Sequence, residues 1–365
     1  MSILIFIIVL AFLILVHELG HFIFAKKSGM LVEEFSIGFP PHIFSFKKGE
    51  TKYSIGAIPF GGYVKIFGED YLESNSSEEK NSHRRFTNQS KKAQALVLAA
   101  GVFFNFLLAW VLFSMAFVSG MPVSASQFEN ESIQDPALVL INVLKDSPAY
   151  NAGLKVGDNI LYLNDGIESL QDFTNIEDVT GFIATRGEKE IEVLYKRGGE
   201  TNLTNLIPQD DLIEGKSAIG VSLDIMGIVD FPIHLAIIEG AKTTASLSVA
   251  TIIGLSSFVG GIFTGNSDLS QISGPIGIIS MVGTAFDFGF LYLISFIALI
   301  SINLAVINLI PIPALDGGRL LFVLIEAIKG TPIKSKLANV FNLAGFLFLI
   351  LLMLIITISD ISKFF

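Results

Sequence analysis

The sequence has no cysteine among its 365 residues, and only 16% of its residues are charged. The absence of thiols excludes a disulfide framework and a thiolate metal site, so any transition metal has to be bound by His, Asp or Glu. The scarcity of charge, together with 51% hydrophobic residues and a mean hydropathy of +0.64, excludes an ordinary water-soluble globule. We therefore expect a protein whose main solvent is the lipid bilayer.

Long apolar runs predict a polytopic α-helical membrane protein with about four transmembrane helices, because about 20 apolar residues cross a hydrocarbon core of about 30 Å. These runs lie within residues 1–29, 93–120, 286–318 and 319–365, the last range beginning with a cytoplasmic loop. The first run differs from a cleaved signal peptide, since no basic segment precedes it and no small-residue cleavage site follows it. Residues 230–285 are partly apolar but interrupted by Ser, Thr, Gly and Lys242, which predicts a surface helix, with a fifth span as the alternative.

Two regions between these runs predict β-structure. Residues 30–92 begin with short alternating pieces separated by Gly and Pro, which indicates hairpins that dip into the membrane, and continue as a solvated loop. Residues 130–213 alternate strand-like pieces with Gly-rich turns, which indicates one inserted α+β domain. The segment 147–165, SPAYNAGLKVGDNILYLND, resembles a PDZ domain, which receives a peptide by strand addition; a generic β domain is the alternative.

The distribution of charge predicts the orientation of the chain. Residues 25–95 contain 11 Lys and Arg and 8 acidic residues, whereas residues 119–287 contain 8 basic and 22 acidic residues. Because cytoplasmic loops are enriched in Lys and Arg, residues 30–92 should be cytoplasmic. The PDZ-like domain and both termini should then be extracytoplasmic.

The strongest chemical signal is the HELGH sequence at residues 17–21, an H-E-x-x-H motif inside an apolar run. On a helix, His17 and His21 lie on one face and can bind one Zn²⁺, with Glu18 beside them as general base. Such polar side chains inside a membrane span are costly unless they are paired, bind a metal or line water. A packed polar cluster is the alternative interpretation.

Asp316 is the candidate third ligand, because a catalytic zinc site uses three protein ligands and an open position. It follows the third apolar run in NLIPIPALDGG, residues 308–318, where prolines break the helix and glycines let the backbone turn. The predicted orientation delivers Asp316 to the same side of the membrane as His17 and His21. A turn or helix-capping aspartate is the alternative.

These motifs, with GVFFN at residues 101–105 and SGPIG at residues 273–277, resemble the bacterial site-2 proteases of the regulator-of-sigma-E type. The resemblance covers nearly the whole chain. It implies an intramembrane metalloprotease of the inner membrane, with Zn²⁺ bound by His17, His21 and Asp316 and with water activated by Glu18. It further implies substrate-binding roles for residues that match other family motifs, namely Asn308, Gly61, Gly62 and Asn105. Many members carry two PDZ domains, whereas this sequence shows one.

The expected substrates are single-span membrane proteins, such as an anti-sigma factor, or remnant signal peptides. A substrate or other peptide is expected at the PDZ-like domain, and no nucleic acid is expected. A non-catalytic membrane scaffold that binds partners through that domain is the alternative, and it predicts that Glu18 is dispensable. A metal transporter is disfavoured, because no internal repeat is visible and the candidate ligands cluster at one face. We assign no metal-binding role to His42, His83 or His234.

Overall fold

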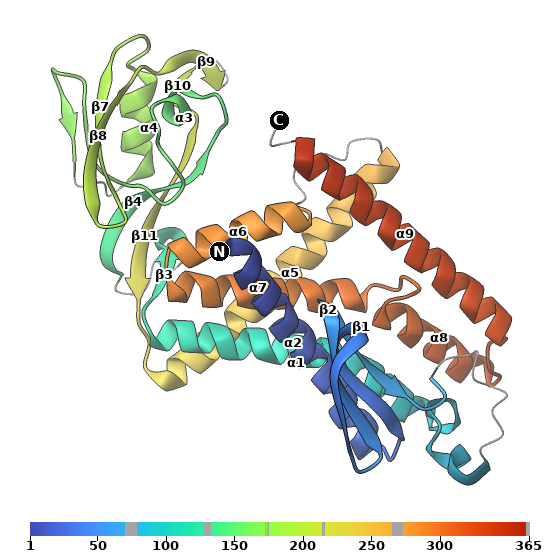
Figure 1. Cartoon of the computed structure of the whole chain (residues 1–365). Coiled ribbons are helices and arrows are strands. Elements are labelled where there is room, and N and C mark those ends of the chain that lie inside the picture. The colour runs from blue at the N-terminus through green and yellow to red at the C-terminus, as the bar shows by residue number, and fades with distance from the viewer. Residues whose placement is uncertain are drawn as a thin grey trace. The chain divides into compact units, whose positions relative to one another are not determined.

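The computed structural model describes residues 1–69, 79–127, 133–171, 173, 175–213, 216–264 and 273–362. These residues form two compact units, which we call unit 1 (Met1–Met115 with His234–Phe365) and unit 2 (Ala116–Ile233) (Figure 1). Residues 70–78 of the predicted solvated loop and residues 265–272 of the predicted surface region lie outside the described residues.

Unit 1 is built mainly from helices. They are α1 (Ser2–Lys27), α2 (Lys91–Val118), α5 (Ile233–Thr264), α6 (Pro275–Asp287), α7 (Phe290–Leu309), α8 (Asp316–Lys329) and α9 (Ser335–Ser362). Five helices of the described residues are long and apolar enough to cross a membrane, namely α1, α2, α5, α7 and α9. The chain is therefore a multi-pass membrane protein.

The fifth candidate span, α5, lies in the region for which a surface helix was expected and a fifth span was the alternative. Polar residues interrupt the apolar sequence without interrupting the helix, because their hydroxyl groups bond within it. Thr244 donates to the carbonyl of Gly240, and Ser248 donates to the carbonyl of Thr244. Lys242 pairs with Glu239, at 2.6 Å, one turn earlier on the same helix.

The directions of three helices follow from their contacts. α2 runs antiparallel to α1, because His17 lies beside Asn105 whereas His21, further along α1, lies beside Val97. α7 runs in the same direction as α1. The first turn of α1 lies close to Gly283 of α6, which precedes the start of α7. Asp316, which follows the end of α7, contacts His17 in the second half of α1. The start of α7 is therefore near the start of α1, and its end is near the later part of α1.

A long hairpin follows α1 in unit 1, formed by β1 (Val32–Lys48) and β2 (Thr51–Ile66). Near the base of the hairpin, Glu34 of β1 lies opposite both Lys52 and Lys65 of β2 in the strand register. β1 therefore lies between the two halves of β2. Large apolar side chains are exposed along the rest of the hairpin: Phe39, Ile43, Phe44, Phe46, Ile55 and Ile58. Short 3-10 helices at Glu79–Arg84 and Phe86–Asn88 then lead into α2.

One apolar core joins the end of α1, the base of the hairpin, α2 and α8. Its buried members are Ala25, Met30, Val32, Ile66, Phe86, Val97, Leu98 and Val323. This core holds the elements around the histidines together.

Unit 2 contains a seven-stranded antiparallel sheet with the order β3-β11-β4-β5-β7-β8 and with β6 on β5. The strands are β3 (Met121–Ser124), β4 (Gln134–Val143), β5 (Asn159–Asn164), β6 (Ser169–Leu170), β7 (Ile191–Arg197), β8 (Glu200–Leu206) and β11 (Val221–Val229), with β9 (Gln209–Ile213) and β10 (Lys216–Ala218) pairing separately. The unit also contains a short 3-10 helix at Ala125–Gln127 and helices α3 (Pro148–Asn151) and α4 (Ile176–Ala184). Unit 2 extends beyond the predicted 130–213, because β3 and β11 complete its sheet.

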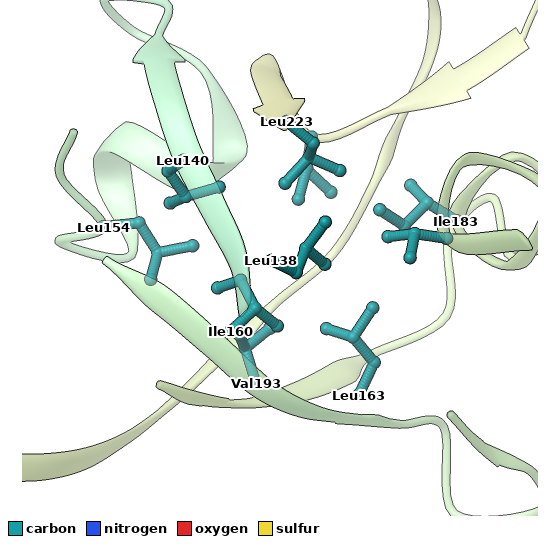
Figure 2. Close-up of a pocket in the computed structure, with 10 residues that line it drawn as sticks. Leu138, Leu140, Leu154, Ile160, Leu163, Ile183, Val193 and Leu223 are labelled. Atoms are coloured by element: carbon teal, nitrogen blue, oxygen red, sulfur yellow. The ribbon is translucent and has the colours of Figure 1, made fainter. Parts of the chain in front are cut away.

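The core of unit 2 consists mainly of aliphatic and aromatic side chains. Leu138 and Leu140 of β4 face Ile183 of α4 across a small cavity, and Ile160 and Val193 line it from neighbouring strands (Figure 2). Burial of these aliphatic side chains stabilises the unit without thiols or metal.

Candidate metal centre

His17 and His21 lie one turn apart on the same face of α1, and both are buried, with 7% and 8% of their surface exposed. α1 is a continuous helix from Ser2 to Lys27, so the four-residue spacing sets both imidazoles on one side. The sequence predicted this arrangement. Burial inside an apolar helix means that the imidazoles require partners.

Asp316 meets the two histidines from the first residue of α8. Between the end of α7 and α8 the chain turns sharply at Ala314, whose φ of 79° lies in the left-handed region. Gly317 and Gly318 follow, and a Cβ at Gly317 would collide with the carbonyl oxygen of Leu309. The two glycines therefore allow the connection to fold over the start of α8, which carries the carboxylate to the histidines.

The three side chains have the geometry of a metal site. Oδ2 of Asp316 lies 3.0 Å from Nε2 of His17 and 3.2 Å from Nε2 of His21, and the two Nε2 atoms are 3.2 Å apart. Adjacent ligands of a tetrahedral zinc ion with bonds of about 2.0–2.1 Å lie about 3.4 Å apart. The observed triangle is close to that size, and three protein ligands are the number that a catalytic zinc site uses. Among the described residues this is the one such His, Asp and Glu cluster.

The carboxylate of Asp316 is held in its charged form. Burial alone would raise its pKa, but the positive charge of His21 and hydrogen bonds from both histidines hold the pKa well below its usual range. A charged carboxylate beside two imidazoles is a donor set that suits Zn²⁺.

α2 forms the wall behind the histidines. Nδ1 of His21 donates to the carbonyl oxygen of Val97 at 2.8 Å, and Nδ2 of Asn105 lies 3.1 Å from Nδ1 of His17. Gly101 lies midway between them along α2, and a Cβ there would collide with both imidazoles. The spacing of four residues between successive contacts places all three on one face of α2.

Glu18 lies beside the base of the hairpin. A Cβ at Gly62 of β2 would be 3.4 Å from Cγ of Glu18, whereas a Cβ at Gly61 would collide with the ring of Phe39. The two glycines thus face opposite sides of β2, as successive strand residues do. Gly62 brings the backbone of β2 close to Glu18, and Gly61 accommodates Phe39.

The remaining predicted residues differ in their surroundings. Asn308 is partly exposed near the end of α7, and its amide makes no hydrogen bond within the described part of the chain. Asn105 is completely buried beside His17. His42 contacts Tyr63 in the hairpin, 3.2 Å from Nε2 to the hydroxyl, and neither it nor His83 or His234 joins the cluster of described metal-binding side chains.

Sequence reasoning missed the part played by Val97. It acts through its backbone carbonyl, which has no sequence signature. The available signal was the four-residue spacing of Val97, Gly101 and Asn105 along a predicted helix. This spacing places a backbone carbonyl, a residue without a side chain and an amide on one face of the helix.

Known proteins resemble this sequence over most of its length. The sequence matches peptidase family M50 over residues 5–352. It is 36% identical to a Clostridium acetobutylicum protein named as a zinc metalloprotease, covering 97% of this chain and 96% of that protein. It is 31% identical to the regulator of sigma-W protease RasP of Bacillus subtilis, covering 99% of this chain and 98% of that protein. A solved PDZ domain of the SdrC-like protein of Listeria monocytogenes is 20% identical, with a TM-score of 0.22, and covers 26% of this chain and 93% of that domain.

Proposed function

Because this chain belongs to peptidase family M50, we propose that His17, His21 and Asp316 bind its zinc ion and that Glu18 is its general base. The protein is a zinc-dependent intramembrane metalloprotease that acts in regulated proteolysis. The observation that supports this assignment is the triangle of donor atoms, 3.0–3.2 Å on each side, buried at the junction of α1 and α8.

The chain's own residues divide the catalytic work between them. When bound, zinc supplies a Lewis acid that polarises the scissile carbonyl and lowers the pKa of water. The Glu18 carboxylate accepts a proton from the attacking water and passes it to the leaving amide nitrogen. Val97 and Asn105 hold the imidazoles, and Gly62 lets the backbone of β2 approach Glu18.

The second half of β2 is suited to hold the substrate as an extended strand. Residues Gly62–Ile66 pair with β1 along one edge, and no described strand pairs with their other edge. A helical substrate hides its carbonyls in its own hydrogen bonds, and strand pairing beside Glu18 would replace them. Asn308, with no described partner for its amide, can hydrogen-bond the opened substrate.

The membrane topology extends this proposal. α1 and α7 run in one direction and α2 in the other, so an even number of crossings must separate α2 from α7. α5 crosses only if the chain returns through α6, which has 13 residues. Otherwise α5 lies along the membrane. Lys26, Lys27 and Arg84 support a cytoplasmic location for the C-terminal end of α1 in a bacterial inner membrane. The proposal then has unit 2 on the extracytoplasmic side and the hairpin re-entrant.

Unit 2 has a groove that fits a peptide. The groove has a volume of about 200 Å³ and lies between α4 and the segment from β10 to β11, with Thr180, Ile183 and Ala184 on one side. β11 pairs with β4 along one edge, and its pairing with β3 on the other begins only at Met226. The edge of β11 before Met226, with which no described strand pairs on that side, can accept an extended peptide, as in PDZ domains.

The proposed substrates are single-span membrane proteins, and an anti-sigma factor is the favoured class. The support is the Bacillus subtilis relative, whose name makes it a regulator of sigma-W. Co-expression with a candidate anti-sigma factor tests this, because a fragment cut within its span should appear only with the active enzyme.

Replacement of Glu18 tests the catalytic proposal. Wild type, Glu18→Gln and the control Glu239→Gln would be purified in detergent, assayed for zinc and given a single-span substrate. We expect Glu18→Gln to retain zinc and lose cleavage by at least about 100-fold, in line with general base catalysis, while Glu239→Gln behaves as wild type. Equal cleavage by all three proteins would favour the non-catalytic scaffold instead.

A further inference from the structure

Asn105 is completely buried on α2, and only one end of its side-chain amide has a partner. Nδ2 lies 3.1 Å from Nδ1 of His17, whereas Oδ1 is buried without a hydrogen-bond partner among the described residues. A buried polar atom without a partner is unusual enough to require an explanation.

The hydrogen-bonding state of His17 decides which end of the amide should face it. This inference rests on the proposed zinc site: Nε2 of His17 faces Asp316 and His21, so with zinc bound there it would be the ligand atom and would carry no proton. In a neutral imidazole the proton then lies on Nδ1, which must donate. An amide NH₂ group at Nδ1 cannot accept that proton, but an amide oxygen can.

We infer that Asn105 presents its amide oxygen to Nδ1 of His17 and thereby fixes the imidazole in the form that binds zinc. The oxygen and nitrogen of an amide have nearly the same shape, and their assignment follows from the hydrogen-bond network. Exchanging the two ends leaves the number of described bonds unchanged, because the end that faces away from His17 has no described partner. The exchange keeps the bond to His17 and makes the NH₂ group, in place of Oδ1, the buried end without a described partner.

The same arrangement already exists at the other histidine. Nδ1 of His21 donates to the carbonyl oxygen of Val97, which leaves Nε2 of His21 free for zinc. Asn105 supplies to His17, through its side chain, what Val97 supplies to His21 through its backbone. The backbone carbonyl of Asn105 accepts a hydrogen bond from the hydroxyl of Ser301 of α7 at 2.8 Å, which holds this part of α2 in place. Asn105 is thus a positioning residue.

Two substitutions test the direction of the hydrogen bond. Asn105→Leu removes it, and loss of such a partner lowers metal affinity about 10- to 100-fold. Asn105→Asp keeps an acceptor but removes the NH₂ group, so zinc affinity should stay within about threefold of wild type or increase, as carboxylate partners of zinc-bound histidines do. Asn342→Leu is the matched control, because Oδ1 of Asn342 is also buried without a described partner and Asn342 lies on α9.

The readout is the zinc dissociation constant, measured for the full-length protein in detergent by competition with a chromogenic chelator. The visible absorption spectrum of the Co²⁺-substituted protein reports the ligand geometry independently of activity. The inference is overturned if Asn105→Leu binds zinc as wild type does, or if folded Asn105→Asp loses zinc as severely as Asn105→Leu. If Asn105→Leu does not fold, the comparison of Asn105→Asp with wild type still decides between the two amide orientations.

Discussion

Gly101 lies where α2 passes directly beneath the two imidazoles of α1, so it is sensitive to the addition of a single methyl group. A Cβ at this position would collide with Nε2 of His21 and Cε1 of His17. Gly20 makes the reciprocal contact, because its Cβ would lie 2.5 Å from the carbonyl oxygen of Ala100. The two glycines set the close approach of α1 and α2, and the metal site depends on that approach.

We expect Gly101→Ala to lower zinc affinity by at least 10- to 100-fold, about the effect of losing an orienting partner. The added methyl group must displace one or both imidazoles, which separates them from Asp316. Chelator competition measures the change. Gly254→Ala on α5 is the control, since a Cβ there meets nothing within 4 Å, and wild-type zinc binding by Gly101→Ala would contradict the expectation.

Asn308→Leu should separate substrate binding from metal binding. The amide of Asn308 has no described hydrogen-bond partner, so its loss should leave zinc content near wild type. Cleavage of a single-span substrate should fall about tenfold, the effect of about one lost hydrogen bond. Asn308→Gln should retain part of the activity, and loss of zinc in Asn308→Leu would assign Asn308 to the metal site instead.

The H-E-x-x-H spacing predicted that His17 and His21 share one face of a helix, because residues four apart lie on the same side. The role of Glu18 came from the motif and stays a prediction. Asp316 required more, because its approach depends on the turn at Ala314 and on the two glycines that follow. The positions of Val97 and Gly101 could not be predicted as part of the site. Their roles arise from the contact between α1 and α2, and a single sequence does not record which helices touch.

α8 connects the chemistry to the rest of unit 1 through two ion pairs. Arg319, one turn after Asp316, pairs with Glu69 at 2.5 Å. Glu326, two turns further along the same face, pairs with Lys91 of α2 at 2.5 Å and also accepts from the backbone of Ile333. In the first pair α8 supplies the cation and in the second it supplies the anion. Together the two pairs hold the helix that carries Asp316.

Lys91→Met should lower the free energy of unfolding by about 2 kcal/mol. The Glu326 side chain is 5% exposed and would keep an unpaired buried charge, although the 34% exposure of Lys91 moderates the effect. Lys242→Met, which breaks the exposed pair with Glu239, should cost less than about 1 kcal/mol. Thermal unfolding in detergent compares the two variants.

The double variant Lys91→Met with Glu326→Met should recover most of that loss, because it removes the unpaired charge as well. Equal stability of Lys91→Met and Lys242→Met would show that the buried pair does not hold α8.

At the scale of elements, the sequence predicted four of the five candidate spans and the hairpin. Hydropathy identifies a span when polar residues are absent, but α5 contains hydroxyl groups that bond to their own helix. Thr244 and Ser248 therefore do not decide between a surface helix and a fifth span, and both stay predictions for α5. Unit 2 also began earlier and ended later than predicted, since β3 and β11 are distant in sequence and meet only in the sheet.

For the whole molecule, the proposed division between catalysis in unit 1 and peptide binding in unit 2 can be tested at the groove of unit 2. Ala184→Trp would fill the groove between α4 and β11 with a large side chain while leaving the donor atoms of unit 1 untouched. Zinc affinity should stay at the wild-type value. Cleavage of a substrate whose extracytoplasmic tail enters the groove should fall about tenfold or more, with the change in KM rather than kcat.

A second substrate that lacks this tail gives the internal comparison, because it cannot use the groove and should be cleaved equally by both enzymes. Val156→Trp adds the same side chain to an exposed position of unit 2 outside the groove and is the matched control. If Ala184→Trp lowers the cleavage of both substrates equally, the groove does not select substrates and unit 2 influences catalysis by another route. If it changes neither, peptide binding by unit 2 is not required for proteolysis.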